Sequence, residues 1–281
     1  MRTVQLIIMI CILVAGSIYG DRTVDNKNGT LTDKKTGLTW ELCKMEDCSD
    51  YDYFDAKERC DSLRLAGRKW RLPTMKELIT IYDYDKSKNI PLEITRSAVW
   101  SESTANESYR YAGELRSDFP VLSEKYKKSD VINTICVSGE VRNNVFVDNN
   151  NGTVMDKSTK LLWQKCSIGQ ENDYLCSGGT TSHNLEDAKK QCQNLKLAGK
   201  KWRLPTIEEL QSLLLFNKTK SFIDIRFFPN SILMYWSSST YAQDTNSAWY
   251  VNGFNNGFNM WYVGYSNKTD STYYVRCVTD P

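Results

Sequence analysis

The sequence predicts an α+β protein made of two tandem, disulfide-stapled domains, each with two helices packed on a small antiparallel sheet. Three observations support this fold class. One sequence pattern occurs twice within the 281 residues, helix and strand patterns follow one another in both copies, and eight of the nine cysteines divide evenly between the copies. Each copy is longer than about a hundred residues, which is enough to bury a core of its own.

The repeat is clearest in one segment of each copy. Residues 65–74 read LAGRKWRLPT and residues 197–206 read LAGKKWRLPT, and a Glu-Leu pair follows both. An Asn-Gly-Thr pattern also recurs, at residues 28–30 and 151–153. A period this long indicates two domains rather than a solenoid. We place the boundary near residues 141–144 and predict one domain over residues 21–142 and a second over residues 143–281.

Each copy is expected to begin with a β-hairpin. Asn-Gly between flanks of alternating apolar residues is the strongest short hairpin signal, because both residues tolerate positive φ. The hairpin would end at Trp40 in the first copy and at Trp163 in the second.

A first helix is predicted downstream of each hairpin. Apolar residues at three- and four-residue spacing mark its buried face. They are Tyr53, Ala56, Cys60 and Leu63 in the first copy, and Leu185, Ala188, Cys192 and Leu195 in the second. Gly67 and Gly199 stand where a C-cap glycine would end this helix.

A second helix is predicted to begin at a capping box. Thr74 with Glu77 forms this pattern in the first copy, and Thr206 with Glu209 forms it in the second. Beyond this helix the second copy turns into short aromatic and β-branched runs broken by Asn, Gly and Ser, which are typical of strands and loops.

The cysteines predict a disulfide framework. The export that the N-terminus predicts would permit disulfides. Eight cysteines allow 105 connectivities, but the repeat favours pairing within each copy. Neighbouring cysteines would close short loops, and the remaining two of each copy would join the first helix to the last strand. The predicted pairs are Cys43–Cys48, Cys60–Cys136, Cys166–Cys176 and Cys192–Cys277. A zinc site is not favoured, because there is no Cys-x-x-Cys and one histidine.

The N-terminus predicts export. Arg2 precedes an almost wholly apolar run from Val4 to Ala15, and small residues follow up to Gly20, as in a secretory signal peptide spanning residues 1–20. No later segment is apolar enough to span a membrane. The net charge of +2, from 36 basic and 34 acidic side chains, lacks the basic bias of nucleic-acid binders.

These motifs carry a family resemblance. Asn-Gly-Thr, then Leu-x-Trp, then Leu-Ala-Gly-x-x-Trp-Arg-Leu-Pro-Thr-x-x-Glu-Leu, resembles the Lcl C-terminal domain, a bacterial family. In the second copy the resemblance continues through residues 235–239 (YWSSS), 248–251 (AWYV), 256–257 (NG) and 274–278 (YVRCV). The first copy is degenerate: the AWYV and NG elements are missing, and residues 100–103 (WSES) keep a trace of WSSS.

The resemblance implies a fold and, more loosely, a role. The family is similar to C-type lectin-like domains, in which a disulfide joins the first helix to the final strand. Its name-giving member is a surface adhesin that binds sulfated polysaccharides. A surface-binding role is therefore implied for this chain, although a fold alone does not carry function.

The stretch from residue 235 to residue 274 is the expected ligand site. Aromatic rings interleaved with amides suit sugars, which present apolar faces and many hydroxyls. Trp236, Trp249 and Tyr274 lie in family elements and are expected in the sheet core. The residues expected to contact ligand are Tyr241, Asn255, Asn256, Trp261, Tyr262 and Tyr265.

Catalysis, metal and cofactors find little support in the sequence. His183 lies in a polar run before a helix, where an exposed or capping role is expected rather than a triad. The Glu-Pro-Asn and Trp-Asn-Asp signatures of calcium-dependent lectins are missing, and only Phe228-Pro229-Asn230 is present. We expect no catalytic residues, no metal and no cofactor.

Three functions remain open at this stage. The leading hypothesis is an exported, non-enzymatic binding protein or adhesin at the cell surface, in the periplasm or secreted, which recognises a glycan or glycosaminoglycan. The alternative is a structural or assembly module of the envelope that binds a protein partner. The third is an enzyme, because formylglycine-generating enzymes share the broad fold class, but the cysteines that such chemistry needs are expected in disulfides.

Overall fold

The computed structural model describes residues 22–43, 45–48, 51–86, 88–89, 97–104, 107–115, 122–140, 143–216, 223–231, 234–254 and 260–280. The expected signal peptide, residues 1–20, lies outside these ranges. Among the helices that are described, none is both long enough and apolar enough to cross a bilayer.

Each copy opens with an antiparallel meander that its last strand completes. In the first copy β1 (Thr23–Asp25), β2 (Thr30–Asp33), β3 (Thr39–Glu41) and β9 (Val137–Ser138) lie in that order in the sheet. In the second copy β10 (Phe146–Asp148), β11 (Thr153–Asp156), β12 (Leu161–Gln164) and β16 (Val278–Thr279) repeat it. The predicted hairpin is therefore part of a four-stranded sheet in each copy.

The Asn-Gly turn differs from the expected one. Gly29 and Gly152 have positive φ, at 82° and 83°, as predicted. The preceding Asn of each Asn-Gly pair does not have positive φ. Instead, the second residue with positive φ in each turn is Lys27 or Asn150. A four-residue turn between the first two strands explains this, because its N–H···O=C bond runs from Asn26 to Thr30.

The first helix of each copy is present where the sequence predicts it, but it ends earlier than predicted. The two helices are α2 (Tyr53–Ser62) and α4 (Leu185–Asn194), and a short α1 (Met45–Cys48) precedes α2. The first three positions of each predicted apolar face are buried. The helices end at C-cap residues Leu63 and Leu195, so the prediction of C-caps at Gly67 and Gly199 was wrong. Those glycines, with φ of 67° and 66°, lie in a later turn.

The second helices begin at the predicted capping boxes. Thr74 starts α3 (Met75–Leu78), which η1 (Ile79–Ile81) continues, and Thr206 starts α5 (Ile207–Ser212). In both boxes the Thr side chain accepts the backbone N–H of the Glu three residues later, and that Glu accepts the N–H of the Thr. This reciprocal arrangement satisfies two helix donors that would otherwise lack partners.

A second sheet of three antiparallel strands completes each copy. It contains β6 (Ser97–Thr104), β7 (Tyr109–Leu115) and β8 (Leu122–Lys127) in the first copy. The second copy has β13 (Met234–Thr240), β14 (Ser247–Phe254) and β15 (Met260–Asn267). The register shifts between Trp100 and Thr104 and, equivalently, between Trp236 and Thr240. The first copy also has the small pair β4 (Tyr82–Asp83) and β5 (Lys88–Asn89).

The four disulfides are the predicted ones. Cys43–Cys48 and Cys166–Cys176 close short loops. Cys60–Cys136 and Cys192–Cys277 join the long helix of each copy to the residue before its closing strand, with Cα atoms 5.5 Å apart in both. The chain is therefore α+β with small antiparallel sheets and disulfides within each copy.

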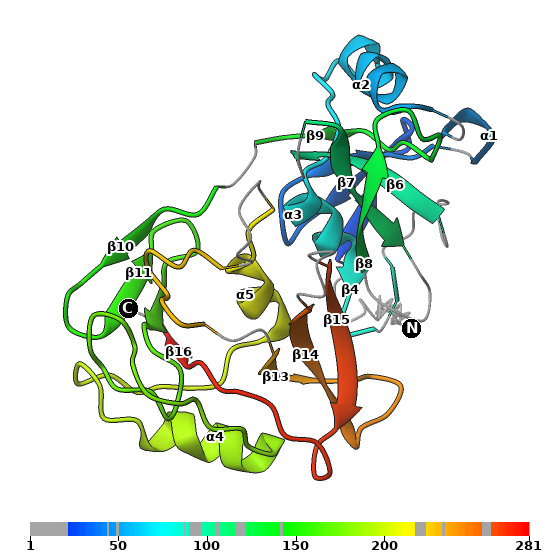
Figure 1. Ribbon diagram of the computed structural model, residues 1–281. Coiled ribbons are helices and arrows are strands. Elements are labelled where there is room, and N and C mark those ends of the chain that lie inside the picture. Colours follow the sequence, from blue (N-terminus) through cyan, green and yellow to red (C-terminus); the bar gives the residue numbers. More distant parts are fainter. Residues whose placement is uncertain are drawn as a thin grey trace, which may run out of the picture.

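The hydrophobic core has three parts. One cluster under α2 belongs to the first copy, and one under α4 belongs to the second. The third and largest is shared, because it contains Trp40 and Tyr84 of the first copy together with Trp163 and Trp249 of the second. In Figure 1 the two copies form two lobes, and β15 reaches the first copy, where it lies against β8. The copies thus bury part of their apolar surface against each other.

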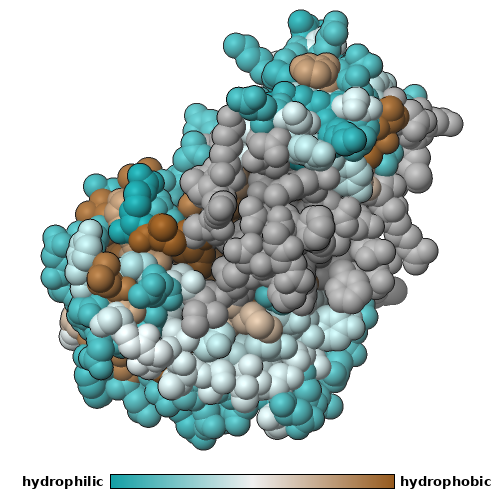
Figure 2. Space-filling view, viewed as in Figure 1, coloured by the Kyte–Doolittle hydropathy of each residue, from teal (hydrophilic) through white to brown (hydrophobic). Residues whose placement is uncertain are grey.

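One face of the molecule is largely polar where its residues are described (Figure 2). On the face that Figure 2 shows, the described residues are mostly hydrophilic, and small hydrophobic patches lie near β10 and β11. Val147 of β10 and Val145, just before β10, are exposed. Scattered apolar residues of this kind are normal on a protein surface.

Candidate functional site

The expected ligand site lies on the β13–β15 sheet, both of whose faces are largely buried. Trp236 and Tyr250 face α4 in the core of the second copy. Trp249 lies on the opposite face, fully buried against Tyr82 and Tyr84 of the first copy. Trp236, Trp249 and Tyr250 therefore build cores, as the sequence predicts for Trp236 and Trp249.

Among the aromatic residues of this sheet whose burial the structure describes, Tyr265 is the one that reaches solvent. Its ring stacks on Tyr241, with the centroids 3.9 Å apart and the planes 12° from parallel. The edge of Trp249 supports both rings, at 4.8 Å from Tyr241 and 5.7 Å from Tyr265. Tyr241 is buried beneath the stack, whereas 38% of Tyr265 is exposed. We call Tyr265, Tyr241 and Trp249 the tyrosine platform.

Polar groups surround the platform at the β13–β14 turn. The Tyr241 hydroxyl donates to Gln243 Oε1 over 2.8 Å. Lys268 Nζ donates to the carbonyl of Thr245 over 2.6 Å and to the hydroxyl of Thr240 over 3.1 Å. Burial and the nearby charge of Lys189 lower the pKa of Lys268, although Asp244 opposes them. Amide, hydroxyl and ammonium groups of this kind can bond a polyhydroxylated ligand.

The six predicted site residues do not all meet at the platform. Tyr241 and Tyr265 stack there, but the backbone of Trp261 pairs with Gly253 and that of Tyr262 with Asn252, further along the β14–β15 ladder. Trp261 and Tyr265 are four positions apart along the strand, which is roughly 13 Å. Asn255 and Asn256 lie outside the described residues.

Arg276 and His183 are held by hydrogen bonds within the protein. Arg276 is fully buried, and its guanidinium donates to the carbonyl of Gln164 over 2.9 Å and to the hydroxyl of Ser231 over 2.8 Å. His183 pairs through its backbone with Tyr273, and its ring bonds the hydroxyl of Thr181 over 2.8 Å. Among the described residues no carboxylate bonds the His183 ring, so its pair with Thr181 does not form a triad.

One group of potential metal ligands occurs among the described residues. Glu41, Cys43 and Cys48 lie within 4.8 Å of one another. The two sulfurs form a disulfide, and the Glu41 carboxylate is bound by both terminal nitrogens of Arg59, over 2.9 and 2.7 Å. A thiolate is the form that ligates metal, so this group is a structural cluster.

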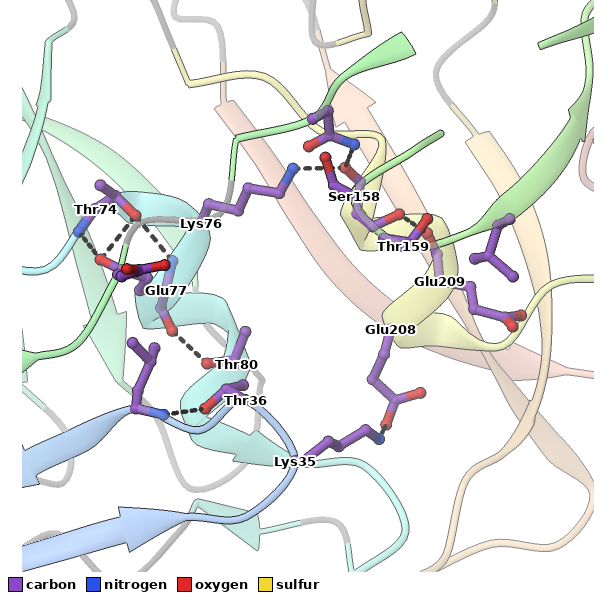
Figure 3. Close-up of a pocket in the computed structure, with 15 residues that line it drawn as sticks. Lys35, Thr36, Thr74, Lys76, Glu77, Thr80, Ser158, Thr159, Glu208 and Glu209 are labelled. Atoms are coloured by element: carbon purple, nitrogen blue, oxygen red, sulfur yellow. Dashed lines mark hydrogen bonds and ion pairs between the residues drawn. The ribbon is translucent and has the colours of Figure 1, made fainter. Parts of the chain in front are cut away.

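A cleft between the copies is a feature that sequence reasoning missed. Its volume is about 500 Å³, within the usual range for small-molecule sites. The close-up in Figure 3 shows that side chains from both copies line it. No local pattern could have located it, because the cleft exists only where the two copies meet.

The two halves of the chain are thus copies of one disulfide-bonded α+β domain. Both match the model of the family described as the Lcl C-terminal domain, over residues 29–138 and 152–279, and the chain belongs to that family. No curated protein matches the sequence. Family membership and the four disulfides are consistent with an extracellular location.

Proposed function

We propose that the chain is an exported, non-enzymatic binding protein that recognises a glycan or glycosaminoglycan on the tyrosine platform. The observation that carries this proposal is the exposed Tyr265 ring, held flat by its stack on Tyr241. A ring fixed in this way loses little freedom when a sugar packs on its outer face, and its hydroxyl supplies a polar contact. Lys268 adds a positive charge near the same turn, which suits an acidic sugar.

The fold assignment is part of the same proposal. We propose that each copy is a C-type lectin-like domain, and the disulfide from the long helix to the closing strand supports this. The proposal does not use calcium, because the side chain of Asn230, the last residue of Phe228-Pro229-Asn230, donates to the carbonyl of Leu175.

Binding of the whole chain without residues 1–20 to a glycan array, followed by titration of any glycan that binds, tests the proposal. We expect Tyr265→Ala to weaken binding by at least about tenfold, which is the loss of roughly 1.4 kcal/mol. Tyr174→Ala is the matched control, because Tyr174 is 81% exposed in the Cys166–Cys176 loop, away from the platform. Equal binding by wild type and Tyr265→Ala, or no glycan bound at all, would contradict the proposal.

A second candidate function rests on that same loop. Tyr174 and Leu175 are both exposed, at 81% and 59%, on a segment closed by a disulfide. Exposed apolar side chains on a rigid loop suit a protein partner. Should Tyr174→Ala abolish association with the cell envelope while Tyr265→Ala has no effect, an envelope module that binds a protein partner would be the better description.

A further inference from the structure

The cleft between the copies is lined by equivalent positions of the repeat. Leu38 of the first copy and Leu161 of the second correspond to each other, and both line it. Lys35 in the β2–β3 turn corresponds to Ser158 in the β11–β12 turn. Lys76 on α3 corresponds to Glu208 on α5. The copies therefore meet in an isologous manner, with each contact on one side expected to have an equivalent on the other.

The charges break this pseudo-symmetry. On one side Lys35 Nζ lies 2.7 Å from Glu208 Oε1, which is an ion pair between the copies. On the other side Ser158 is equivalent to Lys35, and Lys76 is equivalent to Glu208. Lys76 therefore has a neutral serine, rather than an oppositely charged residue, at the position of its partner. Figure 3 shows the Lys35–Glu208 pair on one side and Lys76 extending across the gap toward Ser158 on the other.

The ammonium of Lys76 is only partly satisfied. Nζ donates to the carbonyl of Ser212 over 2.7 Å, and no carboxylate of the described residues lies within ion-pair distance of it. An ammonium has three N–H donors, so two remain for another acceptor. Burial lowers the pKa of Lys76 to about 8, which the charge of Asp156 only partly opposes.

The acids near this ammonium already have partners. Asp156 accepts the side-chain amide of Asn144 over 2.9 Å and the backbone N–H of Ser158 over 2.9 Å. Glu77 and Glu209, which also line the cleft, are bound by Arg71 and Arg203 through two hydrogen bonds each, and Glu208 is paired with Lys35. Glu140, the remaining acid of the lining, is exposed and forms no ion pair among the described residues. The cleft therefore offers a cation without a direct counter-ion beside the apolar side chains of two leucines.

We propose that this cleft binds a small organic carboxylate, with its anionic group against Lys76 Nζ and its apolar body between Leu38 and Leu161. The carboxylate would occupy the place that Glu208 takes beside Lys35 on the opposite side. This site is separate from the tyrosine platform and does not depend on glycan binding. It requires both copies, because α3 supplies the cation and the second copy supplies half of the wall.

Calorimetric titration of the whole chain with benzoate at pH 7 tests this site, with benzamide as the neutral probe of the same shape. We expect benzoate to bind at least about tenfold more tightly than benzamide, because only the former is charged. Lys76→Met should abolish this preference. Lys190→Met, which removes an exposed lysine of α4, should retain it.

A second variant keeps the test decisive if Lys76→Met folds poorly. Ser158→Glu introduces a carboxylate opposite Lys76, so we expect an internal ion pair with Lys76 and loss of benzoate binding. Circular dichroism would establish that both variants are folded. Equal affinity for benzoate and benzamide, or benzoate binding that neither variant changes, would overturn the proposal.

Discussion

Trp249 of the second copy meets Tyr84 of the first copy edge to face, with the ring centroids 5.2 Å apart and the planes at 86°. Tyr82 approaches the same indole at 5.8 Å. All three side chains are buried. Trp249 comes from β14 of the second copy, Tyr82 from β4 of the first copy, and Tyr84 from the turn after β4. The copies are therefore joined by packed aromatic rings as well as by the covalent chain, and we expect them to unfold together.

Trp249→Ala is predicted to destabilise the whole chain. Deleting a fully buried indole leaves a cavity that both copies line, and we expect a loss of about 3–5 kcal/mol in the free energy of unfolding. Urea unfolding, followed by a far-ultraviolet signal from both copies, measures it. Tyr174→Ala, at an exposed aromatic residue, should change stability by less than about 0.5 kcal/mol. Two separate transitions in the wild-type protein would refute joint unfolding.

Tyr84→Phe is predicted to be costly despite its small size. The Tyr84 hydroxyl accepts a hydrogen bond from Gln211 Nε2 of the second copy, and both side chains are buried. Removing the hydroxyl leaves a buried amide without this partner, which costs about 1–3 kcal/mol. Tyr174→Phe, at an exposed hydroxyl, is the matched control. A Tyr84→Phe protein as stable as wild type in urea would show that this hydrogen bond contributes little.

The disulfides are predicted to contribute different amounts to the free energy of unfolding, because they close loops of different length. Cys192–Cys277 spans 85 residues of sequence, and Cys43–Cys48 spans 5. Chain entropy then gives about 4.6 kcal/mol for the long loop and about 2 kcal/mol for the short one. Paired Cys→Ala variants of each disulfide, compared by thermal unfolding, measure the difference. If the short loop costs as much as the long one, loop entropy is not what these bonds supply.

Gly264→Ala is predicted to disturb the β13–β15 sheet. A Cβ at Gly264 would lie 2.7 Å from the Tyr250 hydroxyl and 2.8 Å from its Cζ, because this ring lies directly over the glycine. Tyr250 is buried and cannot swing aside, so we expect a loss of about 1–3 kcal/mol. Gly179→Ala is the control, since nothing lies within 4 Å of its built Cβ. Equal melting temperatures for both variants would mean that Tyr250 has room to move.

Local features of the fold could be predicted from the sequence because local chemistry determines them. The capping boxes at Thr74 and Thr206 need only a hydroxyl and a carboxylate three residues apart. The buried face of α4 follows from helical periodicity, and the disulfide pairing follows from the repeat. The ends of α2 and α4 could not be located in this way, since a glycine four or five residues further on serves a separate turn.

The contacts between the copies could not be predicted, because periodicity shows which side chains are buried but not what they pack against. Tyr82 and Tyr84 correspond to Leu214 and Phe216 of the second copy, so the repeat gives no sign that these tyrosines reach Trp249. The candidate site was predicted in part. Aromatic enrichment identified the strand that carries Tyr265, but the division of its rings between core and surface depends on the first copy covering one face.

The contribution of Lys76 to stability is predicted to increase at alkaline pH. The pKa of Lys76 is about 8 in the folded protein and near 10.5 when unfolded, so between these values the unfolded chain binds the extra proton. The contribution of Lys76 to stability therefore rises with pH from about 8 to about 10.5, by roughly 1–3 kcal/mol after allowance for its partial exposure. Below pH 8 both states are protonated and this contribution is constant.

Two charged neighbours bear on this comparison: the charge of Asp156 acts on Lys76, and Lys35 forms an ion pair with Glu208 across the cleft. The difference in unfolding free energy between wild type and Lys76→Met, measured in urea from pH 7 to pH 10.5, isolates the effect from other lysines and tyrosines. It should move in favour of wild type above pH 8, whereas Lys190→Met should show no such trend. A difference that stays flat over the whole interval would mean that the cleft does not desolvate this ammonium.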